Sequence, residues 1–137
     1  MNHQKISIGA IINAPVSEVW INWTEPVHIK QWNNASEDWH TPHAENDLRV
    51  GGKFLSRMEA KDGSFGFDFE GVYSEVIPFE KIKYELEDGR EVETVFDGSK
   101  ETTKVTTTFD AENENPVEMQ KDGWQAILNN FKKYVEQ

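Results

Sequence analysis

A change in the spacing of apolar residues near Pro116 limits the folds open to this chain. From Phe54 to Phe109 apolar side chains recur at every second position, interrupted by turn segments such as EDGR and DGSK. This alternation predicts antiparallel strands with one apolar face, joined by hairpin turns. After Pro116 the spacing becomes helical, with a stripe of Trp124, Ile127, Leu128, Phe131, Tyr134 and Val135. A sheet with one apolar face needs a cover, and this helix is the only element long enough.

A strand and two short helices are expected before the sheet. Apolar residues alternate between Lys5 and Asn13, which predicts a strand. Pro15 suits the first turn of a helix that carries Val19 and Trp20 on one side. The segment EPVHIKQW predicts a second short helix.

Two glycines in a row interrupt the pattern before the long alternating region. The residues from Asn33 to Glu45 have no clear period and predict a loop, with an edge strand near Trp39. Gly51 and Gly52 then mark a bulge or sharp bend within a strand. We expect at least one of the two glycines to have a positive φ angle.

Composition narrows the classes of partner. The 137 residues suit one domain, residues 1–137, and they hold 25 acids against 14 bases, a formal net charge of −11. Such a surface repels phosphate backbones and anionic lipids, so we expect neither a nucleic-acid nor a membrane partner. The chain has no cysteine, and the segment MNHQKISIGA lacks the apolar core of a signal peptide. We therefore expect a cytoplasmic protein, either a monomer or a weak homodimer.

Few polar residues stand in patterns typical of catalysis or metal binding. His40 and His43 lie among carboxylates, but Pro42 separates them, and a solvated loop is the favoured interpretation over a metal site. We see no catalytic triad, nucleophile elbow or phosphate-binding glycine loop, and we predict no catalytic residue and no cofactor. Arg49 either points into a cavity and holds a carboxylate ligand or pairs with Asp47 to hold the loop.

Five segments together resemble one protein family. They are INAPVSEVW, DLRVGG, DFEGVYSEVIPFEKIKYE, TTKVTTTF and DGWQAILNNFKKYV, in this order from residue 12 to residue 135. The family is named for the activator of the heat shock protein 90 ATPase, C-terminal-domain type, within the START-like (SRPBCC) superfamily. The resemblance implies an α+β helix-grip fold, in which a curved antiparallel sheet wraps around a long C-terminal helix and two short helices follow the first strand. The superfamily includes lipid carriers, hormone receptors, polyketide cyclases, hydrolases and co-chaperones.

The aromatic residues are the candidates for a binding cavity between sheet and helix. Ligand pockets are mostly apolar with a few polar groups, and the helical stripe faces the apolar row of the sheet. We predict a protein that binds a small hydrophobic molecule there. The alternatives are a chaperone-associated interaction module and, third, a cyclase- or hydrolase-like enzyme. The predicted cavity residues are Trp20, Trp32, Arg49, Phe54, Met58, Phe67, Phe69, Tyr73, Tyr84, Phe96, Trp124 and Leu128.

Overall fold

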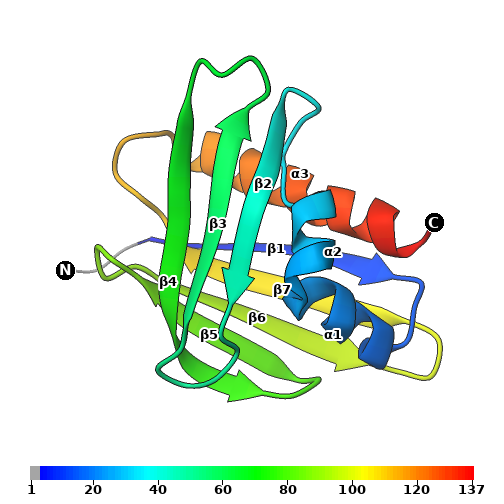
Figure 1. The fold of residues 1–137 in the computed structure, drawn as a ribbon. Helices are drawn as coiled ribbons and strands as arrows, with labels where there is room; N and C mark the ends of the chain where they lie inside the picture. The colour runs from blue at the N-terminus through cyan, green and yellow to red at the C-terminus, as the bar shows by residue number, and fades with distance from the viewer. Residues whose placement is uncertain (1–3) are drawn as a thin grey trace.

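A long helix crosses the open side of a strongly curled antiparallel sheet in the computed structural model, which describes residues 4–137 (Figure 1). This is the expected α+β helix-grip fold, and the expected order of elements is confirmed. The elements are β1 (Lys5–Ile12), α1 (Val16–Thr24), α2 (Pro26–Trp32), β2 (Trp39–Asn46), β3 (Lys53–Ala60), β4 (Gly66–Ile77), β5 (Lys81–Leu86), β6 (Glu91–Gly98), β7 (Thr103–Asp110) and α3 (Val117–Val135).

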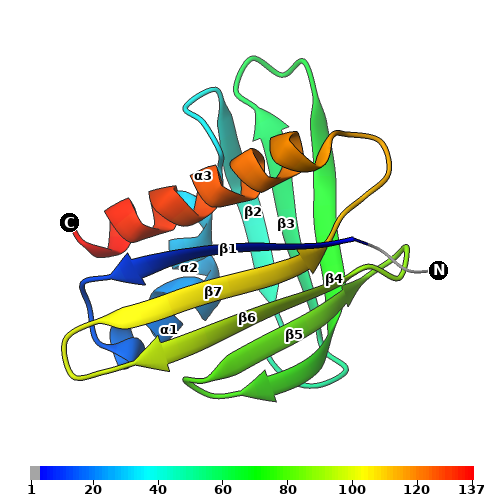
Figure 2. The ribbon, with the colours of Figure 1, turned by 180° about the vertical axis from the view of Figure 1, so that it is seen from behind.

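The sheet has the strand order β1-β7-β6-β5-β4-β3-β2, and every neighbouring pair is antiparallel. Its edge strands are β1 and β2. Helix α3 packs along β1 and helix α2 packs along β2, as Figure 2 shows from behind. Both edges are therefore accompanied by a helix, which limits further pairing with another chain.

Strand β4 forms the corner of the sheet. Its first part, Gly66–Val72, pairs with β3, whereas Gly71–Ile77 pairs with β5. The two pairings overlap at only Gly71 and Val72, and the register shifts between Tyr73 and Glu75. A bulge strengthens local twist and bends the strand. The β2–β3–β4 part of the sheet therefore turns away from the β5–β6–β7–β1 part, and a hollow opens between the sheet and α3.

The apolar face of α3 is the cover that the sheet requires. Phe131 is completely buried, and its ring centroid lies 4.9 Å from those of both Trp23 and Trp32. Leu128 is buried in the same cluster, which also takes in Phe109 of β7. The predicted helical stripe therefore lies in the core and joins the two short helices to the sheet.

The glycine pair has a different setting from the one expected. Gly51 has φ 84°, as predicted for at least one of the two, but both glycines lie in the connection between β2 and β3 rather than inside a strand. The backbone N–H of Gly51 donates to the Tyr73 carbonyl at 2.8 Å, and the N–H of Tyr73 donates to the Gly52 carbonyl at 2.9 Å. The connection thereby continues pairing with β4 at the corner. The edge strand expected near Trp39 is present as β2, but it extends through most of the segment expected to be a loop, with a register shift between residues 40 and 43.

Candidate functional site

A cavity of about 420 Å³, partly open to solvent, lies between the concave face of the sheet and α3. Its volume is within the range of roughly 300–1,000 Å³ typical of small-molecule sites. Most of the predicted cavity residues line it: Trp32, Phe54, Met58, Phe67, Phe69, Tyr73, Tyr84, Trp124 and Leu128. Because the side chains of a strand alternate between the two faces, β3 and β4 each contribute every second residue to this wall.

Aromatic rings form a continuous part of the cavity wall. The rings of Phe54 and Tyr84 meet edge to face, with centroids 4.6 Å apart. The ring centroids of Phe69 and Trp124 lie 6.1 Å apart, so the ring contacts extend from the sheet to α3. Trp124 itself stacks on Phe109 at 4.0 Å with an interplanar angle of 12°. This stacking fixes the orientation of the one tryptophan that α3 contributes to the wall.

Arg49 does not point into the cavity, which corrects one of the two expectations for it. Its side chain is 71% exposed, and its Nε donates to both carboxylate oxygens of Asp47 at 3.0 Å. This is the alternative interpretation, a pair that holds the β2–β3 connection. The neighbouring carboxylate raises the pKa of Arg49, chiefly through the side-chain hydrogen bond.

Trp20 and Phe96 are also not part of the cavity wall. They pack edge to face on each other at 5.3 Å in the core under α1, and Phe96 also meets Trp23 at 5.6 Å. Trp23 lines the cavity in place of Trp20. Alternation predicts the inward direction of Phe96 correctly, but α1 covers that end of the sheet and leaves no space there.

Several polar groups of the wall have partners within the protein. The Tyr73 hydroxyl donates to the Asn46 side-chain oxygen, and the Asn46 amide donates to the Thr24 carbonyl at 2.7 Å. Burial raises the pKa of Tyr73, so its hydroxyl remains protonated at neutral pH. The hydroxyls of Thr94 and Thr107 pair with each other at 2.9 Å. These polar groups therefore stabilise the fold through hydrogen bonds within the protein.

Ser56 and Tyr84 differ, because neither hydroxyl has a hydrogen-bond partner among residues 4–137. Both residues line the cavity, and Ser56 is only 5% exposed. No fully enclosed side-chain nitrogen or oxygen in the described chain lacks a partner, so these two hydroxyls border open space. Sequence reasoning missed Ser56 as a site residue, although it alternates with Phe54 and Met58 on the same face of β3.

Arg90 is a further wall residue that sequence reasoning missed. It stands directly before β6, and it shares the inward face with Val92 and Thr94. Its side chain is 22% exposed, and its Nε donates to Asp88 at 2.7 Å. Arg90 is the arginine that lines the cavity, and alternation along β6 was the signal that could have identified it.

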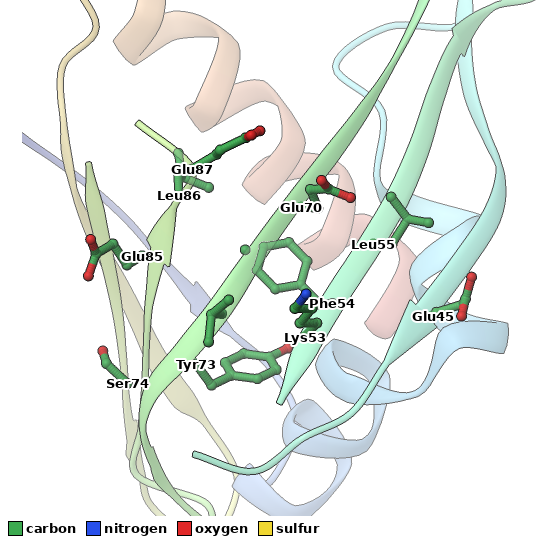
Figure 3. Close-up of a pocket in the computed structure, with 12 residues that line it drawn as sticks. Glu45, Lys53, Phe54, Leu55, Glu70, Tyr73, Ser74, Glu85, Leu86 and Glu87 are labelled. Atoms are coloured by element: carbon green, nitrogen blue, oxygen red, sulfur yellow. The ribbon is translucent and has the colours of Figure 1, made fainter. Parts of the chain in front are cut away.

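A second, larger hollow of about 690 Å³ lies on the outer side of the corner (Figure 3). Its rim carries Lys53 and four carboxylates, those of Glu45, Glu70, Glu85 and Glu87. Phe54 and Tyr73 line both hollows, and Figure 3 shows their rings in the middle of this groove. We take the smaller cavity as the candidate site because it has the apolar wall and the unpartnered hydroxyls. The outer groove is an acid-lined surface.

The two histidines considered as metal ligands, His40 and His43, lie on β2, and each of them is close to one carboxylate. His43 Nε2 lies 2.7 Å from Glu45, and His40 Nε2 lies 3.8 Å from Glu59. Within residues 4–137, His, Asp and Glu side chains form no group of three or more that could hold a metal ion. That same part of the chain contains no helix with the length and apolar character needed to cross a bilayer.

Comparison with known proteins places this fold and cavity in a family. The sequence matches the family described as "Activator of Hsp90 ATPase homolog 1-like protein" over residues 13–136. The chain belongs to this family. A search of curated proteins found no match.

Solved structures of Activator of Hsp90 ATPase homolog 1-like proteins and of more distant proteins share the fold. An AHSA1-like protein from Aeromonas hydrophila is 47% identical, with a TM-score of 0.91 over 97% of this chain and 92% of that one. A protein from Cytophaga hutchinsonii is 48% identical, with a TM-score of 0.84 over 96% of this chain and 92% of that one. A protein from Chromobacterium violaceum, 22% identical with a TM-score of 0.86 over 98% and 99% of the two chains, shows the fold alone. The fold is consistent with either a ligand-binding or a co-chaperone module.

Proposed function

We propose that this protein binds a small apolar molecule in the cavity between the sheet and α3. The observation that carries this proposal is the pair of unpartnered hydroxyls, Ser56 and Tyr84, in a wall that includes a continuous set of aromatic rings. A buried hydroxyl without a partner costs free energy, on the order of 1–3 kcal/mol, unless water or a ligand satisfies it. Two unpartnered hydroxyls that face the same cavity therefore favour an occupant that forms hydrogen bonds with them.

The phenols of the cavity wall do not supply a general base, which fits a carrier or sensor. The two phenols, Tyr73 and Tyr84, both have a raised pKa because of burial, so neither acts as a base near neutral pH. Family membership also allows the co-chaperone alternative, which requires a protein partner rather than an occupied cavity. A ligand-binding measurement therefore separates the two functions.

Titration with the neutral fluorescent dye N-phenyl-1-naphthylamine tests the proposal. The dye should bind with one site per chain and raise the melting temperature. Quenching or shift of tryptophan emission should accompany binding, and Trp124→Phe should reduce that signal while the thermal shift remains, with Trp23 and Trp32 of the same wall giving the rest of the response. At a dye concentration about 100 times its Kd, the stabilisation should reach about 2.7 kcal/mol.

A matched pair of variants locates the dye. Ser56→Phe fills the cavity and should abolish binding. Ser7→Phe makes the same change on the exposed face of β1 and should leave binding intact. If the dye does not bind, or if both variants bind it equally well, the cavity is not a ligand site and the co-chaperone alternative gains support.

A further inference from the structure

Among the described residues, Arg90 is the one basic side chain that lines the cavity. The three arginines, Arg49, Arg57 and Arg90, each donate Nε to an acid two residues away, at 2.7–3.0 Å. Arg49 and Arg57 lie away from the cavity, whereas Arg90 forms part of its wall. The two terminal nitrogens of Arg90 have no hydrogen-bond partner among residues 4–137.

The strand register brings Arg90 to Tyr84. Tyr84 of β5 pairs directly with Val92 of β6. Arg90 lies two residues before Val92 and on the same face, so it is the diagonal neighbour of Tyr84. Diagonal neighbours in an antiparallel pair lie about 7–8 Å apart at Cα, within reach of long side chains. A guanidinium and an unpartnered phenol therefore border the same end of the cavity.

Carboxylates of the protein could compete with a ligand for the charge of Arg90. Asp88, which is 56% exposed, neutralises Arg90 through Nε alone. Glu112 lines the cavity as well, but its Oε1 accepts the backbone N–H of Asn115 at 2.6 Å, and it forms no ion pair with Arg90. Burial raises the pKa of Tyr84, and the charge of Arg90 opposes that rise without reversing it. The Tyr84 hydroxyl therefore stays protonated at neutral pH and can donate a hydrogen bond.

We infer that the ligand is an apolar molecule ending in one carboxylate, which Arg90 binds through its two terminal nitrogens with the Tyr84 hydroxyl as a further donor. A guanidinium presents parallel N–H groups that match the two oxygens of a carboxylate. The aromatic wall of Phe54, Phe69 and Trp124 holds the apolar part. This inference rests on the proposed function and specifies the chemical class of its ligand.

Decanoate and decan-1-ol test the inference, because they share a chain and differ in the charged end. Each is titrated against protein loaded with N-phenyl-1-naphthylamine, and displacement gives its Kd. Wild-type protein should bind decanoate at least about tenfold more tightly than decan-1-ol, since hydrogen bonds to charged groups are the stronger ones. Arg90→Gln should remove that preference while leaving the Kd of decan-1-ol within about twofold. Tyr84→Phe should weaken decanoate by a smaller factor.

Arg49→Gln is the matched control, because Arg49 has the same pairing with an aspartate but lies outside the cavity. It should change neither Kd. Asp88→Asn provides a second test that does not depend on how well Arg90→Gln folds. Loss of the neutralising carboxylate should tighten decanoate binding, and Asp47→Asn beside Arg49 should not.

The outcomes separate the two proposals. Equal affinity of wild-type protein for decanoate and decan-1-ol, or an unchanged decanoate Kd in Arg90→Gln, overturns the carboxylate inference and leaves the cavity function standing. Failure of the dye, decanoate and decan-1-ol to bind at all overturns the proposed function, and the inference falls with it.

Discussion

Phe54 of β3 contacts Tyr84 of β5 across the intervening strand β4, with ring centroids 4.6 Å apart. The contact is possible because Gly71 of β4 pairs with Phe54 and has no side chain. A Cβ atom at Gly71 would lie 2.8 Å from the Phe54 ring and 3.0 Å from the Glu85 carbonyl oxygen. The missing side chain at the corner therefore shapes the cavity wall.

Gly71→Ala should destabilise the protein by about 1–3 kcal/mol, because the added methyl group overpacks the corner. Urea denaturation measures the change. Gly123→Ala in α3 is the control, since nothing lies within 4 Å of its Cβ position. That substitution should instead stabilise the helix by up to about 1 kcal/mol. The same sign for both substitutions would contradict the close approach at Gly71.

Phe131→Ala should cost about 3–5 kcal/mol, because it leaves a cavity at a completely buried site between Trp23 and Trp32. Thermal unfolding followed by circular dichroism measures the loss. Phe65→Ala removes the same ring from a position that is 61% exposed and should cost less than about 1 kcal/mol. An unchanged melting temperature in Phe131→Ala would show that α3 does not cover the sheet.

The two glycines of the β2–β3 connection should differ in their tolerance of alanine. At Gly51, where φ is 84° and space is open, alanine should cost about 1–2 kcal/mol from backbone strain alone. At Gly52 a Cβ atom would lie 2.1 Å from the Asp47 carbonyl oxygen, so alanine should cost at least about 3 kcal/mol. Gly63→Ala, with φ 79° and open space in the β3–β4 turn, should match Gly51→Ala. A smaller loss at Gly52 than at Gly51 would refute this ordering.

Stability should fall as the pH rises above about 10, in part because of Tyr84. The unfolded chain releases this phenol proton near the ordinary pKa of 10.0, whereas burial raises the pKa in the folded state. Above pH 10 the unfolded state therefore binds fewer protons, and the free energy of unfolding decreases with pH. Tyr84→Phe should show a shallower decrease between pH 10 and pH 11 in urea titrations. An identical slope in both proteins would mean that Tyr84 does not contribute.

Alternation of apolar residues predicted most of the fold and much of the cavity wall. It placed Phe54, Met58, Phe67 and Phe69 on one face, and the structure finds all of them along the cavity. Alternation reports only direction, however, and not what covers a given end of the sheet. Phe96 faces inward as expected, but α1 fills the space above it.

The arginines show where local pattern is insufficient. Arg49 and Arg90 each follow an aspartate by two residues, so the spacing alone does not distinguish them. Arg49 belongs to a connection whose direction depends on Gly51 and on pairing with β4. Arg90 continues the alternation of β6, and this strand register places it at the cavity. The local pairing was therefore predictable, whereas the choice of inward arginine required the pattern of the adjoining strand.

The negative charge of the chain, to which the carboxylates of the outer groove contribute, should slow the approach of an anionic ligand. Glu45, Glu70, Glu85 and Glu87 surround the groove, and the whole chain carries a formal charge of −11. An incoming carboxylate meets this repulsive field before it contacts Arg90, and 0.1 M salt screens such fields beyond about 10 Å. Rising ionic strength should therefore speed association of an anionic ligand, while dissociation, governed by contacts inside the cavity, changes little.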